Sequence, residues 1–183
     1  MGDDELVAEA RRGNARAFGR LVELHQPRLY GMLAKMTGDS ELALDLSQEA
    51  FIRAWQGLEG FEGRATFSTW LYRIAVRLAY DARRDPRHDD PDALAGIADP
   101  APGPDAHLDR SAEAEDLRRR IETLPDMQRA VVTLRTYNDL PYREIATILE
   151  TSENSARVSF HHAIMRLKEG YLRDGRRQEA PTR

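Results

Sequence analysis

One stretch near the middle of the chain limits its folding more than any other feature: DPRHDDPDALAGIADPAPGPDAHLD, residues 85–109. It contains five of the nine prolines and shows no sustained helical spacing of apolar residues. Because proline lacks a backbone N–H and disfavours helix in the residue before it, such a stretch does not continue a helix. We therefore expect a flexible, locally extended linker between two short halves of the chain.

On both sides of this linker, apolar residues recur at the spacing of an α-helix, and no segment shows the alternation of a strand. The predicted fold class is therefore all-α: two small helical domains, residues 1–84 and 113–183, joined by a flexible acidic linker, residues 85–112. Helices are expected within 6–13, 15–38, 39–57, 65–84, 111–124, 126–137, 142–150 and 152–168.

Several residues mark where these helices begin or end. Pro27 is able to begin a second segment inside 15–38, and Gly38 is a stop signal. Asp39 or Ser40 is of the type that caps the next helix.

Charge is distributed unevenly. Residues 1–84 carry 12 acidic and 12 basic residues, residues 85–116 carry 10 and 2, and residues 117–183 carry 9 and 13. The overall charge of −4 therefore conceals an acidic linker and a basic C-terminal part. Parts with such different charge have different electrostatic tasks, so the overall charge does not exclude a nucleic-acid partner.

Composition and motifs exclude several function classes. The chain has no cysteine, which excludes disulfides, thiolate metal sites and thiol nucleophiles. It has no P-loop, dinucleotide-binding glycine pattern or HExxH motif, and its histidines are scattered, so we predict no enzyme activity, catalytic residue, metal site or cofactor. No apolar run is long enough for a membrane span and the acidic N-terminus is unlike a signal peptide, so we expect no membrane insertion and a cytoplasmic location.

The stretch PYREIATILETSENSARVSFHHAIMRLK, residues 141–168, has the pattern of a helix-turn-helix. A short helix follows Pro141, a turn follows it, and the second helix has a buried stripe and a polar outer face. The second helix of this motif offers its N-terminal side chains to the major groove. The predicted base-reading set is Asn154, Ser155, Arg157, Val158, Ser159 and His162, and the predicted phosphate contacts are Arg135, Arg143, Arg166 and Lys168.

The adjacent histidines His161 and His162 within this helix do not fit the pattern of a metal site well. Neighbouring helical residues diverge by about 100°, whereas a metal-binding pair requires i, i+4 spacing and a nearby carboxylate. We therefore interpret His162 as a base-reading residue and His161 as a neighbour on the flank. The alternative for the whole motif is an ordinary helical hairpin with a solvated face.

A second basic line lies in FSTWLYRIAVRLAYDARR, residues 67–84. Phe67, Trp70, Leu71, Ile74 and Leu78 form its predicted buried stripe. Beside the stripe, residues at i, i+4, i+7 and i+11 suit a helix that follows a phosphate backbone and stacks on an unpaired base: Arg73, Arg77, Tyr80 and Arg84. The alternative is an arginine face neutralised by neighbouring acids, but Asp81 is the only acid between positions 63 and 84.

In this order, the segments resemble an extracytoplasmic-function (ECF) sigma factor, the compact class of initiation factor of bacterial RNA polymerase. DLSQEAFIRAW (45–55) is similar to the region 2 signature for docking on the core polymerase. Residues 67–84 resemble the helix that melts the promoter and reads its downstream element, and residues 124–169 resemble region 4. The acidic stretch lies where such factors have their interdomain linker.

The resemblance implies fold, partners and sites. Residues 1–84 would be the region 2 domain and residues 113–183 the region 4 domain, which contact the −10 and −35 promoter elements respectively. The partners would be core RNA polymerase, promoter DNA and an anti-sigma factor. The loop at 61–67 lies where the family captures a base flipped out of the melted strand.

The resemblance also assigns roles to particular residues. Asp45, Gln48, Glu49 and Arg53 would face the polymerase, and Glu49 precedes Arg53 at ion-pair spacing, whereas Phe51 and Trp55 would serve the core. The downstream-element set would be Arg64, Thr66, Ser68, Thr69, Arg73, Arg77, Tyr80 and Arg84. The upstream-element set would be Asn154, Ser155, Arg157, Val158, Ser159, His162 and Arg166.

Three departures from the family pattern stand out. Arg77 replaces a usual Asn, Glu150 replaces the small turn residue before the recognition helix, and Val158-Ser159 replaces a frequent Ser-Arg pair. We expect these changes to give a distinctive upstream promoter sequence and to leave the mechanism intact. The alternatives are a stand-alone helix-turn-helix regulator, which would not need the helices of 39–84, and a helical adaptor that binds only protein.

Overall fold

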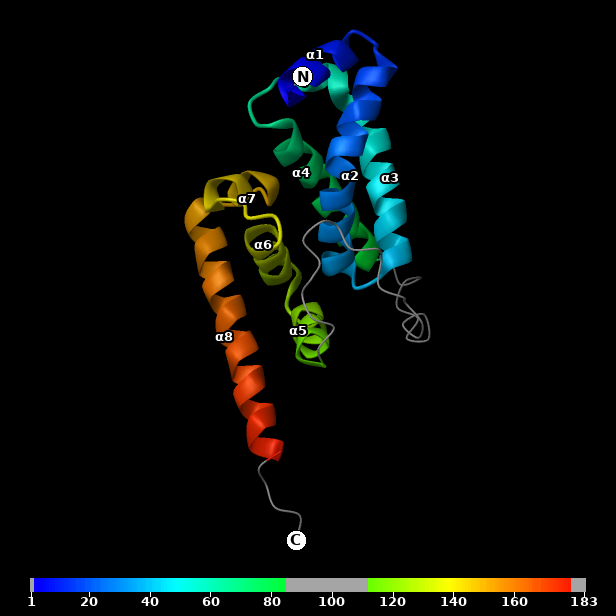
Figure 1. Ribbon diagram of the computed structural model, residues 1–183. Coiled ribbons are helices and arrows are strands. Elements are labelled where there is room, and N and C mark those ends of the chain that lie inside the picture. The colour runs from blue at the N-terminus through cyan, green and yellow to red at the C-terminus, as the bar shows by residue number, and fades with distance from the viewer. Residues whose placement is uncertain (1, 85–111, 179–183) are drawn as a thin grey trace.

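The computed structural model describes residues 2–84 and 112–178, and over these residues it is helical without any strand (Figure 1). The predicted all-α fold class is therefore confirmed for the described residues. The predicted linker at 85–109 lies outside them. No described helix is long and apolar enough to cross a membrane.

The first four α-helices form what we call the N-terminal bundle. They are α1 (Asp3–Arg11), α2 (Ala15–Thr37), α3 (Ser40–Gly57) and α4 (Phe67–Arg84), with a short 3-10 helix (Leu58–Gly60) after α3. Asp39 caps α3 as expected, because its side chain accepts hydrogen bonds from the N–H groups of Glu41 and Leu42. Gly38 ends α2 in the left-handed conformation, at φ 75°.

Helix α2 continues through Pro27 and does not begin a second segment there. Proline removes one hydrogen bond of the helix, but Pro27 itself is exposed. Leu21 before it and Leu29, Met32 and Leu33 after it are fully buried. Packing on both sides of the proline therefore keeps one helix where the sequence allowed two.

Within residues 112–178, the α-helices form what we call the C-terminal bundle: α5 (Ala112–Glu122), α6 (Asp126–Thr136), α7 (Tyr142–Ile148) and α8 (Glu153–Gln178). The turn between α7 and α8 contains Glu150 at φ 53°. Ser152 caps α8, because its Oγ accepts a hydrogen bond from the N–H of Ser155 at 3.0 Å. The predicted helix-turn-helix is thus α7, this turn and α8.

The buried stripe of α8 agrees with its predicted spacing, with one difference. Ala156, Ala163 and Leu167 are buried, and Phe160 packs against the same cluster as the apolar residues of α7. Ile164, which has the same helical spacing, is only half-buried and packs against Leu124 and Val132. The reason is that α8 passes beyond the short α7 and continues along α6.

The two bundles pack directly against each other, which the sequence did not predict. Helix α7 lies against α4, and α6 lies against α2 (Figure 1). One apolar cluster includes residues of both bundles. As a result α4 is buried beyond the predicted stripe, at Tyr72, Val76 and Ala79, while Trp70 and Ile74 of that stripe are only half-buried.

Candidate nucleic-acid interfaces

The outward face of α8 presents the predicted base-reading residues to solvent. Asn154, Ser155, Val158 and His162 are exposed, and Ser159 is half-buried. Val158 keeps 43% of its surface exposed although it is apolar. This face offers amide, hydroxyl, imidazole and methyl groups, which together suit the mixed polar and methyl pattern of base edges in a major groove.

The arginines around this face differ in how available their guanidinium groups are for a contact with DNA. Arg157 pairs with Glu153 at 2.8 Å and its guanidinium lies 5.4 Å from the ring centroid of Tyr142. An exposed i, i+4 ion pair contributes only about 0.3–0.5 kcal/mol, so this pair does not prevent Arg157 from contacting DNA. Arg135 is less available, because it donates a hydrogen bond to the carbonyl of Leu140 at 3.0 Å. The other predicted phosphate contacts are exposed: Arg143, Arg166 and Lys168.

His161 and His162 are both exposed and their ring centroids lie 6.3 Å apart, with the rings inclined at 54°. Over residues 2–84 and 112–178, no group of three or more histidine, cysteine or acidic side chains is placed to hold a metal ion. The rings are therefore positioned for separate contacts.

Arg73 and Arg77 of α4, both predicted to contact DNA, share one carboxylate of the C-terminal bundle. The Nη2 atom of each forms an ion pair with Oε1 of Glu150, in the turn between α7 and α8. The hydrogen bond from Arg77, together with the charge of Arg73, holds the pKa of Glu150 below its usual range. The same hydrogen bond raises the pKa of Arg77.

Other predicted DNA contacts on α4 also meet the C-terminal bundle. Thr69 is only 3% exposed, and its hydroxyl donates to Glu144 of α7 at 3.2 Å. The hydroxyl of Tyr80 lies 3.5 Å from the carbonyl of Asp126, and burial raises the pKa of Tyr80 to about 12. Arg84, at the end of the line, is exposed.

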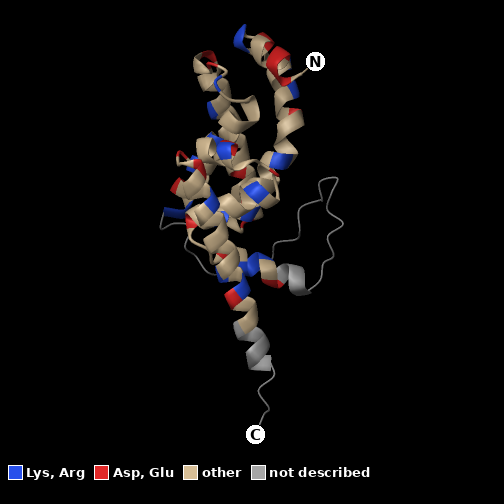
Figure 2. Ribbon diagram, turned by 90° about the vertical axis from the view of Figure 1, so that its left-hand side faces the viewer, with Lys and Arg blue, Asp and Glu red and all other residues tan. Residues whose placement is uncertain are grey.

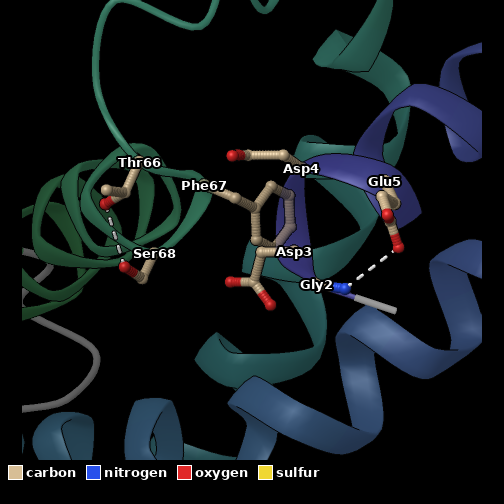
Figure 3. A pocket seen from close by; sticks show the side chains of 7 residues that line it. All are labelled: Gly2, Asp3, Asp4, Glu5, Thr66, Phe67 and Ser68. Atoms are coloured by element: carbon tan, nitrogen blue, oxygen red, sulfur yellow. Dashed lines mark hydrogen bonds between the residues drawn. The ribbon is translucent and has the colours of Figure 1, made fainter.

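The start of α4 borders a hollow on the surface, shown in Figure 3. Thr66 and Ser68, both in the predicted downstream set, lie on one side with their hydroxyls 3.0 Å apart. The acidic residues of α1 line the other side. Carboxylates accept hydrogen bonds from the amino groups of bases and repel phosphates, so this hollow suits a base edge better than a DNA backbone. Arg64 of the preceding loop is exposed and pairs with Glu62 at 2.6 Å.

The predicted polymerase-binding residues lie together on α3. Asp45, Gln48 and Arg53 are exposed and Glu49 is half-buried. Arg53 Nε lies 2.7 Å from Glu49 Oε1, as the i, i+4 spacing predicted. Helix α3 lies on the side of α2 away from α8 (Figure 1).

Apolar side chains accompany these charges on α3. Leu44 is 42%, Ile52 52% and Trp55 39% exposed. Phe51 is buried as expected, but Trp55 lies at the edge of the core, with its ring 4.9 Å from that of Phe18. A surface with exposed aliphatic and aromatic groups among charges is typical of a protein-binding site.

The sequence did not identify Glu144, Glu150 and Asp126 as partners of α4. Acidic and basic residues occur throughout both bundles (Figure 2), so no local charge run marks these three. The only available signal was that Arg77 and Glu150 both depart from the family pattern. The structure shows that these two residues contact each other.

Comparison with known proteins identifies relatives of both bundles. The family model for sigma-70 region 2 matches residues 21–88, and the model for sigma-70 region 4 matches residues 114–167. The sigma-H factor of Pseudomonas aeruginosa RNA polymerase is 36% identical over 172 residues, covering 88% of this chain and 89% of that protein. The ECF sigma-E factor of Escherichia coli RNA polymerase is 32% identical over 174 residues, covering 89% and 91%.

Two solved structures share the fold. CnrH, in complex with the cytosolic domain of CnrY, superposes with a TM-score of 0.73 at 24% identity and covers 94% of this chain and 98% of that one. The sigma factor RpoE of Bartonella quintana, in complex with the anti-sigma factor NepR, gives a TM-score of 0.66 at 21% identity, covering 83% and 94%. With regions 2 and 4 both matched, and close relatives along most of its length, the chain belongs to the ECF sigma factors of bacterial RNA polymerase.

Proposed function

We propose that this chain docks on core RNA polymerase through α3, reads the −35 element with α8, and reads and melts the −10 element with α4 and the loop before it. The exposed face of α8, on the second helix of the region 4 helix-turn-helix, is the observation that carries this proposal. In this assignment residues 1–84 are the region 2 domain, residues 85–112 the linker and residues 113–183 the region 4 domain.

At the upstream element, α8 enters the major groove with its N-terminal end. Asn154, Arg157 and His162 contact base edges, and Val158 contacts a thymine methyl. Arg143, Arg166 and Lys168 contact phosphates and fix the register without reading sequence. Val158-Ser159 brings no charge to this face of α8. Discrimination between upstream base sequences therefore depends more on His162 and Arg157.

At the downstream element, α4 holds the separated strand. Arg73 and Arg77 neutralise phosphates, and Tyr80 stacks on an unpaired base. Thr66 and Ser68 border the hollow that receives a flipped base. Unstacking a base costs a few kcal/mol, and binding of the extruded base in that hollow offsets part of the cost.

The spacing of the two elements requires the bundles to separate on a promoter. Elements centred at −35 and −10 are about 25 base pairs apart, or about 85 Å of duplex at 3.4 Å per base pair. A fully extended chain the length of residues 85–111 spans roughly 90 Å, so the linker is long enough for both bundles to reach their elements. The directly packed arrangement is therefore a state of the chain off the promoter.

We propose that core polymerase and promoter DNA are the partners that act on this chain in the cytoplasm, and that it is an initiation factor and not an enzyme. The related RpoE of Bartonella quintana was solved with an anti-sigma factor. An anti-sigma factor that covers the apolar and charged face of α3 would keep this chain from polymerase.

The test is to mix the purified chain with core polymerase that lacks any sigma factor, and to measure co-elution and run-off transcription on genomic promoters. We expect a one-to-one complex and transcripts with discrete start sites. Failure to join the core would overturn the proposal, and binding without initiation would favour the adaptor alternative. Binding to promoter DNA without affinity for the core would favour a stand-alone regulator.

A further inference from the structure

Arg77 of α4 and Glu150, in the turn between α7 and α8, form an ion pair across the two bundles. We propose that the ion pairs of Glu150 with Arg73 and Arg77, which we call the clasp, keep the downstream DNA-binding face of α4 from binding DNA. The face would become available when the C-terminal bundle moves away. The inference rests on the proposed function, because it assumes that these arginines bind the promoter. It goes beyond that function by assigning a regulatory contact to this chain's own residues.

The clasp and a DNA strand compete for the same groups. Both guanidinium groups contact a single carboxylate oxygen, and a carboxylate oxygen occupies the position that a phosphate oxygen would take. The side chains of Arg73, Arg77 and Glu150 keep 41%, 57% and 46% of their surface exposed. Because the ion pairs remain accessible to water, they can exchange for phosphate when the bundles separate.

The backbone at Glu150 is unusual for its residue type. At φ 53° it lies in the left-handed region, which is unfavourable for a residue with a side chain because Cβ approaches the following carbonyl oxygen. Glycine would adopt this turn without that cost. The hydrogen bond and ion pairs of its carboxylate supply the interaction that offsets the strain at this position.

The rest of the interface covers the same face of α4 along most of its length. Thr69 donates a hydrogen bond to Glu144 near the beginning of the helix. Arg83 Nε lies 3.1 Å from Asp126 Oδ1 near its end. Between them Val76 is 1% exposed, three residues after Arg73 and thus on the same helical face.

The clasp leaves the other proposed contact surfaces free. Asp45, Gln48 and Arg53 of α3, and the outward residues of α8, remain exposed while it is closed. A closed chain can therefore meet polymerase and an upstream duplex but not a downstream strand. With the clasp in place, the downstream face of α4 could bind DNA only after the two bundles separate.

A thiol-labelling experiment on the full chain measures opening directly. Since the chain has no cysteine, Val76→Cys introduces one reporter on α4, and its labelling rate by Ellman's reagent is proportional to the open population. We expect Glu150→Gln to speed this labelling by about fivefold, which corresponds to the loss of two partly exposed ion pairs.

Two controls separate opening from other effects. Glu153→Gln removes the same charge three positions away, from a residue that pairs only within α8 with Arg157, and it should not alter the rate. Ala54→Cys places the reporter in the fully buried part of α3, where Glu150→Gln should have no effect. An unchanged rate at Val76→Cys, or an equal acceleration at Ala54→Cys, would overturn the clasp.

A second measurement links opening to DNA. The apparent affinity of the full chain for a fluorescent, randomised single-stranded DNA should rise by the same factor in Glu150→Gln as the labelling rate does, because affinity scales with the competent fraction. Faster labelling without tighter binding would overturn the withholding of DNA. If no variant binds DNA or polymerase, the proposed function fails, whereas an unchanged labelling rate in a chain that still initiates transcription overturns the clasp alone.

Discussion

Helices α4 and α8 both carry residues predicted to contact DNA, yet their surroundings differ. The outward residues of α8 face solvent. The line on α4 faces the C-terminal bundle, where Thr69, Arg73 and Arg77 each have an acidic partner. Both helices have the amphipathic pattern of a DNA-binding helix, but of the two only α8 presents its predicted contact residues to solvent in this arrangement.

The difference shows what helical spacing can and cannot establish. Spacing identifies which residues share a face, because that depends only on the local geometry of the helix. It does not identify what lies opposite that face. The sequence near α4 offered one acid, Asp81, but the acid that pairs with Arg73 and Arg77 is Glu150, more than 70 positions later.

The largest expected effect comes from removing the buried cation that joins the bundles. Arg129 is 2% exposed and donates hydrogen bonds to the carbonyls of Met36 in α2, at 3.1 Å, and of Leu124, at 3.0 Å. Arg129→Met leaves both carbonyls without this donor, so we expect a loss of about 3 kcal/mol in the free energy of unfolding. Urea denaturation followed by circular dichroism measures it.

The matched control is Arg143→Met, which removes an exposed arginine from α7. It should change the unfolding free energy by less than about 0.5 kcal/mol. Equal stability of the two variants would contradict the assignment of Arg129 as a structural link between the bundles. It would also remove the link invoked here for why α4 is covered by the C-terminal bundle while the outward face of α8 is exposed.

The next effect tests whether the covered face of α4 serves DNA at all. Replacing Arg73 and Arg77 together by Ala removes two phosphate contacts, and we expect run-off transcription to fall by roughly 10- to 100-fold at every promoter. The salt dependence of initiation should become shallower. Normal transcription by this variant would mean that the two arginines serve only the contact with Glu150.

Much of the architecture could be predicted from the sequence because local signals determined it. The cap at Asp39, the stop at Gly38 and the buried stripe of α8 all depend on neighbouring residues, and the structure has each of them. The exposure of Val158 and His162 followed from the same helical spacing.

What could not be predicted depends on contacts distant in sequence. Burial of Tyr72 and Val76 requires the C-terminal bundle, and continuity of α2 through Pro27 requires packing of residues on both sides. Glu150 was recognised as unusual, but no local rule connects it with Arg73 and Arg77. The site residues of α3, α4 and α8 remain predictions, and the promoter experiments below test those of α4 and α8.

A smaller effect is expected from a steric wedge between the bundles. A Cβ atom added at Gly31 of α2 would clash with the hydroxyl oxygen of Tyr137. The ring of Tyr137 also lies beneath the Lys35 ammonium, with its centroid 4.4 Å from Nζ. Gly31→Leu improves helix propensity but displaces this ring, so labelling of Val76→Cys should accelerate by about tenfold, an effect of about 1.4 kcal/mol.

The wedge has an internal control. Adding Tyr137→Ala to Gly31→Leu removes the clash, so the labelling rate should return toward that of the parent chain. Acceleration that persists in the double variant would indicate damage to α2 itself. No acceleration in the single variant would contradict the close approach of α2 and the C-terminal bundle.

The smallest expected effect concerns the open face of α8. His162→Ala removes one base contact, so we expect a change of about 1 kcal/mol, or roughly fivefold, in preference at a single upstream position. Overall initiation at the best promoters should remain within a few-fold of the parent chain. Glu169→Ala, an exposed change farther along α8, is the matched control and should leave preference unaltered.

If α8 and α4 read separate promoter elements, as we propose, a randomised-promoter selection with core polymerase will separate their contributions. Both elements would be randomised, and transcripts from the parent chain, His162→Ala and Arg73→Ala would be sequenced. We expect one preferred upstream and one preferred downstream element for the parent. His162→Ala should alter the upstream preference, whereas Arg73→Ala should reduce initiation and leave the upstream preference unchanged. Unchanged preferences with His162→Ala, or an altered upstream preference with Arg73→Ala, would contradict the proposal.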